Sequence, residues 1–188
     1  MRKRLAEVLT AMDESRNALM ATVADAGGAF AAVRPNEEAW SVAEILAHLA
    51  LVEAGVARLV ASSVRWARNN GVAEEVSDES VLASLDQFGL ATPTRKIKAP
   101  AMVDVGPDAD MAEAVRSLTG SRAELRQALI DGDGLDLASV VRPHARLGEI
   151  NIYQWALFVA QHEERHRKQI EATLREVTGR AAECAPIV

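Results

Sequence analysis

The sequence predicts an all-α protein, specifically a four-helix bundle. Apolar residues recur every three or four positions along four long stretches, as on the buried face of an amphipathic helix. These stretches are residues 2–26, 42–70, 111–130 and 151–178. Signals for helix starts and stops fall at their ends, and no stretch alternates for long like a half-buried strand. Four long amphipathic helices joined by loops bury their apolar faces best as a bundle.

The first two helices have clear boundaries in the sequence. The stretch 2–26 is followed by Gly27, and glycine is favoured just after the end of a helix. Ser41 is a natural N-cap for the second helix, and Glu44 three residues later completes a capping box. We therefore assign Glu44 to the cap; the alternative is that its carboxylate supports His48, four residues later, as a hydrogen-bond partner. Gly71 is expected to end this helix.

A long connection, residues 71–107, follows the second helix. Within it, Asp78–Phe88 is expected to form a short helix and Arg95–Val105 an extended chain. Connections of this length are uncommon unless they cover something or cross the molecule. In a bundle, such a crossover lets the second and third long helices run parallel.

The third helix is expected to begin at a second capping box, formed by Asp110 and Glu113. Its apolar stripe is interrupted by Arg122. Long basic side chains usually extend from such positions to the solvent, so we expect Arg122 to reach the surface. The alternative is that Arg122 faces an anionic ligand and acts as a cofactor-binding residue.

Residues 132–150 are expected to form a loop before the fourth helix. Asn151 caps this helix together with Gln154, and Thr178-Gly179 is expected to end it. We therefore expect one bundle domain, residues 1–180, and a C-terminal tail, residues 181–188.

Composition excludes several classes of function. The 188 residues carry a formal net charge of −6, which argues against a nucleic-acid-binding protein. No apolar run approaches the roughly 20 residues that span a bilayer, and the basic N-terminus is not followed by the apolar segment of a signal peptide. The single cysteine, Cys184, cannot form an internal disulfide. These observations favour a cytoplasmic protein.

Three histidines stand out as candidate metal ligands. His162 and His166 lie four residues apart on the apolar stripe of the fourth helix, and His48 borders the stripe of the second. Imidazoles four apart on a helix point the same way, and a divalent metal satisfies such groups in a core. Three histidines without a fourth protein ligand are typical of an open, catalytic site. The alternative is that these histidines are hydrogen-bonded to neighbouring side chains in the core. The fourth histidine, His144, is expected at the surface or at the rim of a pocket.

The segment from His162 to His166 also fits the H-E-x-x-H signature of zinc metalloproteases. The extended form of that signature needs glycine and histidine where this chain has Gln169 and Ala172, so we set the protease interpretation aside. Glu163 keeps two interpretations. It is either a catalytic base near a metal-bound water or a solvent-facing charge.

The second and fourth helices resemble the signatures of a known family. Trp40-Ser-Val-Ala-Glu-Ile-Leu-Ala-His-Leu-Ala50 and Phe158-Val-Ala-Gln-His-Glu-Glu-Arg-His-Arg-Lys-Gln-Ile170 are similar to those of the DinB superfamily. The resemblance implies an up-down-down-up bundle and a divalent metal, usually zinc or nickel, on His48, His162 and His166. It also implies a homodimer. Characterised relatives include bacillithiol S-transferases and mycothiol-dependent isomerases and transferases, in which the metal activates a low-molecular-weight thiol.

Three hypotheses about function remain. The first is a metal-dependent thiol S-transferase involved in detoxification, with a thiol such as bacillithiol or mycothiol as co-substrate. The second is a metal-dependent hydrolase that uses metal-bound hydroxide. The third is a non-enzymatic protein that binds a metal or a small ligand under stress. In each case the expected partner is a small molecule, with no nucleic acid and no membrane.

Overall fold

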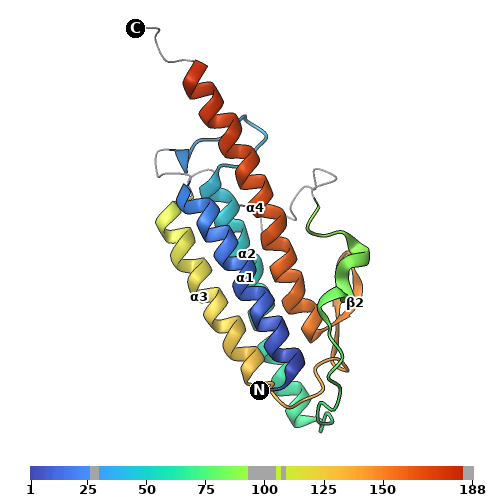
Figure 1. The fold of residues 1–188 in the computed structure, drawn as a ribbon. Helices are drawn as coiled ribbons and strands as arrows, with labels where there is room; N and C mark the ends of the chain where they lie inside the picture. Colours follow the sequence, from blue (N-terminus) through green and yellow to red (C-terminus); the bar gives the residue numbers. More distant parts are fainter. Residues whose placement is uncertain (26–29, 93–104, 107–108, 184–188) are drawn as a thin grey trace.

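The computed structural model describes residues 1–25, 30–92, 105–106 and 109–183. Four long α-helices dominate this part of the chain (Figure 1). The elements are α1 (Lys3–Asp25), α2 (Val42–Asn69), the 3₁₀ helix η2 (Leu82–Phe88), α3 (Met111–Ile130), β1 (Val141–His144), β2 (Gly148–Asn151) and α4 (Ile152–Glu183).

The four long helices follow an up-down-down-up course, as predicted (Figure 1). The backbone nitrogen of Arg2, before α1, donates to Asp133 just beyond the end of α3, so these two helices are antiparallel. The Arg68 guanidinium near the end of α2 donates to the Asp131 carbonyl at the end of α3, so α2 and α3 are parallel. The end of α2 and the start of α3 therefore lie at opposite ends of the bundle.

The buried apolar residues form two clusters, one toward each end of the bundle. The first combines the N-terminal halves of α1 and α4 with the C-terminal halves of α2 and α3, and includes Leu5, Val60, Leu129 and Ala156. The second combines the opposite halves, and includes Leu19, Leu46, Leu118 and Ile170. Buried charged and polar side chains lie between the clusters: Glu53, Ser121, Arg122 and Glu163. A polar layer thus divides the core at mid-height.

The predicted helix starts are confirmed, with one correction. Ser41 and Glu44 form the reciprocal capping box of α2. Asn151 and Gln154 exchange the same pair of hydrogen bonds at the start of α4. At α3, the Asp110 carboxylate accepts from the backbone nitrogen of Glu113. The Glu113 carboxylate, however, accepts from Arg116 instead of completing a box.

Two boundaries differ from the prediction. The expected loop 132–150 contains an antiparallel hairpin in which Val141 pairs with Asn151 and His144 with Gly148. Its strands are four residues long, too short for an alternating pattern to show. Helix α4 continues past Thr178-Gly179 to Glu183, so the start of the expected tail is helical. The short helix within 78–88 is confirmed as η2, and the expected extended chain lies almost entirely outside the described residues.

Helix α2 is long and apolar enough to cross a membrane, judged by length and composition alone. This property was not expected from the sequence. Core helices of soluble proteins pass the same test, and half of the most apolar window of α2 is buried inside the bundle. Its buried residues include His48 and Glu53. We therefore interpret α2 as a central helix of the bundle.

Candidate metal centre

Three histidines from two helices meet in one cluster. His48 comes from α2, and His162 and His166 come from successive turns of α4. One ring nitrogen from each lies within 4.8 Å of the others, and the Nε2 atoms of His162 and His166 are 3.1 Å apart. His48 and His166 are buried, whereas His162 is partly exposed. His162 is therefore the member of the cluster that is most accessible to solvent.

Aromatic side chains pack against the cluster on two sides. The Trp40 ring, just before the N-cap of α2, lies 4.9 Å from the His48 ring. On α4, Phe158 stacks on His162 one turn earlier in the helix, with ring centroids 5.3 Å apart and planes 18° from parallel. These contacts fix the planes of the two imidazoles and reduce their exposure to water.

Gln169 orients the third histidine. Its side-chain oxygen lies 2.8 Å from Nδ1 of His166, and an amide oxygen can only accept, so Nδ1 carries the proton. The Nε2 lone pair of His166 then points into the cluster, as in metal sites where a partner of the distal nitrogen sets the tautomer. Gln169 was not predicted as a partner of His166, although the two residues have the i,i+3 spacing that brings side chains together on a helix.

The environment favours the neutral form of His162 and His166. Burial is the main cause that lowers the pKa of His162 well below its usual value, helped by the neighbouring imidazoles and by Arg165. Burial, His48 and Arg165 likewise lower the pKa of His166 to about 3, against the opposing effect of Gln169. Neutral imidazole is the form that binds metals.

The spacing of the nitrogens suits a divalent ion. Zinc binds imidazole nitrogens at about 2.0–2.1 Å in a tetrahedral arrangement, which places two such nitrogens about 3.4 Å apart. The 3.1 Å separation of the His162 and His166 nitrogens is close to this value. His48 lies within reach, so a small adjustment of side chains would complete a three-histidine site. The residues present therefore fit a metal ion.

Comparisons with known proteins place this fold and cluster in a family. The sequence matches the DinB superfamily over residues 11–170, which include all three histidines. The chain belongs to the DinB superfamily. It is also similar to the uncharacterized protein YuaE of Bacillus subtilis, with 24% identity over 73% of this chain and 79% of that protein. The crystal structure of TT2238, a four-helix bundle protein, covers 89% of this chain and 98% of its own, with a TM-score of 0.59 and 24% identity, and supports the fold alone.

In this DinB-superfamily protein, Glu163 does not take the solvent-facing position that was one of its two interpretations from the sequence. Its side chain is 1% exposed, so it is not a solvent-facing charge. Its carboxylate accepts hydrogen bonds from Ser15 and Arg16 of α1 and from Arg122 of α3. Because these donors occupy both oxygens, the contacts do not support a role as catalytic base.

Arg122 corrects a second expectation. It does not reach the surface but is 6% exposed, and its guanidinium pairs with Glu53 and Glu163. The alternative of an anionic partner is therefore closer to the structure, although the anions are protein carboxylates. These contacts engage the Arg122 guanidinium within the protein and do not indicate a cofactor-binding role.

His144 lies at the rim of the cluster, which agrees with the expectation. Its ring packs against Phe158 at 4.7 Å and against Trp155 at 4.9 Å, and Phe158 separates it from His162. Its Nδ1 accepts from the backbone nitrogens of Arg146 and Leu147. His144 thus holds the hairpin turn against α4.

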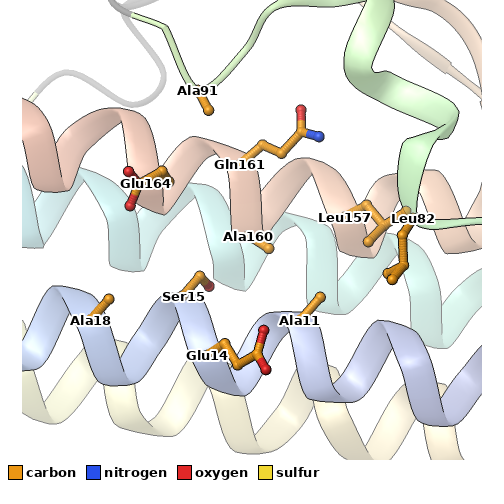
Figure 2. Close-up of a pocket in the computed structure, with 10 residues that line it drawn as sticks. All are labelled: Ala11, Glu14, Ser15, Ala18, Leu82, Ala91, Leu157, Ala160, Gln161 and Glu164. Atoms are coloured by element: carbon orange, nitrogen blue, oxygen red, sulfur yellow. The ribbon is translucent and has the colours of Figure 1, made fainter.

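A separate groove of about 410 Å³ runs between α1 and α4. Figure 2 shows Ala11, Ser15 and Ala160 between the two helices, with Glu14 and Glu164 at its edges. None of the three clustered histidines lines it. The groove is therefore distinct from the candidate metal centre.

The lowered pKa values predict that the metal-free protein loses stability as the pH falls. An imidazole that is neutral in the folded state but titrates near 6.5 when unfolded favours the unfolded state below that pH. Each of the two imidazoles on α4 should then lower the free energy of unfolding by on the order of 2 kcal/mol as the pH falls from 6.5 to 5. Urea unfolding of metal-stripped protein over this range measures the effect. A double variant, His162→Leu with His166→Leu, should give a flatter profile, and an equally flat wild-type profile would contradict the prediction.

Proposed function

We propose that His48, His162 and His166 bind one divalent ion, with zinc or nickel as the expected metal. The observation that carries this proposal is the convergence of three ring nitrogens within 4.8 Å. In addition, Gln169 directs the Nε2 lone pair of His166 into the same space. Among the described residues, the cluster offers three protein ligands, so coordination positions remain for a small molecule.

We further propose that the protein is a metal-dependent enzyme that activates a low-molecular-weight thiol for S-transfer. A divalent ion bound at the cluster supplies Lewis acidity, which lowers the pKa of a coordinated thiol or water. The chain itself holds the imidazoles neutral and shields them with Trp40 and Phe158. The partly exposed side at His162 gives a small molecule access.

The position of Glu163 favours thiol chemistry over hydrolysis. A hydrolase benefits from a base within hydrogen-bonding reach of the attacking water. The candidate carboxylate is instead bonded to Ser15, Arg16 and Arg122. Transfer from a thiol does not require such a base, because sulfur binds a metal as thiolate. The hydrolase and the non-enzymatic binding protein remain the alternative proposals.

Metal analysis of protein purified without chelators tests the binding step. We expect about one zinc or nickel ion per chain, as three-histidine sites hold. Titration of stripped protein with either ion should restore the same ratio. A protein that retains no metal and takes up neither ion in titration would overturn the proposal. We also propose that the protein forms the homodimer that the family resemblance implies, and light scattering on the same sample tests this.

A panel of thiols then separates the three functions. Bacillithiol, mycothiol and glutathione should be offered with electrophiles, alongside simple esters and amides. For a thiol transferase, binding of the correct thiol should release about one proton per site, and turnover should require the metal. Ester or amide cleavage without thiol dependence favours the hydrolase. Metal binding with no turnover in any assay favours the binding protein.

A further inference from the structure

The polar layer between the two apolar clusters contains a closed ring of ion pairs. Arg16 of α1 bonds to Glu53 at 2.6 Å and to Glu163 at 2.7 Å. Arg122 of α3 bonds to the other oxygen of Glu53 at 2.5 Å and to that of Glu163 at 2.8 Å. Each arginine thus joins both carboxylates, and each carboxylate meets both arginines. We call these four residues the Arg–Glu ring.

The ring is well buried and has further hydrogen bonds. Glu53, Arg122 and Glu163 have side chains no more than 8% exposed, and the Arg16 side chain is 13% exposed. Ser15 donates to Glu163 at 2.6 Å, and Ser121 donates to Glu53 at 3.0 Å. Two positive and two negative charges balance inside the layer. Such a set is tolerated in a core only when every member is paired.

The two carboxylates belong to the helices that carry the histidines. Glu163 directly follows His162 on α4, and Glu53 lies five residues after His48 on α2. The arginines that join them come from α1 and α3. The ring therefore ties the position of one histidine-bearing helix to that of the other, through both remaining helices.

We propose that the Arg–Glu ring sets the register of α2 against α4, and so positions His48 opposite His162 and His166. This inference rests on the proposed metal site. Apolar helix faces built from Ala, Val and Leu repack readily after a small shift. A slip of α4 by one turn, about 5.4 Å, would instead leave buried charges without partners. Buried polar groups that specify helix register are known from coiled coils, and a metal site needs its ligands placed within about 0.5 Å.

A variant that replaces the whole ring separates positioning from stability. In the full-length protein we would combine Arg16→Met, Glu53→Leu, Arg122→Met and Glu163→Leu. Because well-packed apolar residues can replace a buried ionic set without loss of stability, this variant should fold with an unfolding temperature near that of wild type. Its affinity for Co²⁺ should nevertheless fall by about 10–100-fold, as when supporting residues of metal sites are lost. The visible absorption of bound Co²⁺ should change, because that absorption reports ligand geometry.

Glu163→Gln provides a second variant in case the fourfold change prevents folding. Its Co²⁺ affinity, measured at a temperature where it is fully folded, should also fall. The matched control is Glu75→Gln, which weakens another buried pair, Arg4–Glu75, near the start of α1. The control should lose stability but keep the wild-type Co²⁺ affinity and spectrum.

The outcomes distinguish this inference from the proposed function. If wild-type protein does not bind Co²⁺, the metal site itself is refuted. If wild type binds it and the ring variants bind it equally well with an unchanged spectrum, the positioning role is refuted while the metal site stands. Equal losses of affinity in Glu75→Gln and Glu163→Gln would also overturn the inference, because they would trace the effect to general destabilisation.

Discussion

Arg122→Ala is expected to destabilise the protein by about 3–5 kcal/mol, the usual effect of removing one partner from a buried ion pair. Arg122 is 6% exposed and bonds to Glu53 and Glu163. Its loss leaves two buried carboxylates with Arg16 as their shared cation, so a charge without compensation remains in the core. Urea unfolding at neutral pH measures the change.

The same helix offers a matched control, Arg116→Ala. Arg116 also pairs with a glutamate, Glu113, but the two side chains are 67% and 69% exposed. An exposed pair contributes about 0–1 kcal/mol, so this variant should stay close to wild type. Similar losses in Arg116→Ala and Arg122→Ala would show that the burial of the ring has no energetic consequence. Combining Arg122→Met with Arg16→Met, Glu53→Leu and Glu163→Leu should recover most of the lost stability.

The helices were predictable because their signals are local. A capping box such as Ser41 with Glu44 is complete within four residues, and an apolar stripe reports which face of one helix is buried. The hairpin was missed because its ladder is formed by two four-residue strands. The one local signal in the sequence is Gly148. It follows a three-residue loop and adopts a φ of 75°, as the residue after a three-residue hairpin loop usually does.

The histidine cluster was partly predictable, and the Arg–Glu ring was not. His162 and His166 share a helix, so their spacing alone places them together. An imidazole within an apolar stripe also indicates a polar partner or a metal in the core. Arg122 and Glu163 depend on partners from other helices, and a sequence does not say which charges will meet. One sign was available: Glu53 is the single formal charge between Glu44 and Arg58. A lone carboxylate in such an apolar stretch indicates a buried cation nearby.

His162→Leu should remove divalent-metal binding while leaving the helical bundle in place. The imidazole contributes one of the three converging nitrogens, so its loss should weaken affinity by more than the roughly 10–100-fold that supporting residues contribute. Leucine suits the same position, because it can pack on Phe158 within an apolar stripe. Circular dichroism should therefore show nearly unchanged helix content, and titration with zinc or nickel should show little binding.

His144→Leu is the matched control for that variant. His144 also packs on Phe158, but its ring is not part of the three-histidine cluster. If His162 acts as a ligand, His144→Leu should bind metal with nearly wild-type affinity. Equal loss of binding in both variants would mean that the packing around Phe158, rather than a ligand, had been removed. Complete unfolding of His162→Leu would show that this histidine is structural, and the proposal of an open functional site would then fail.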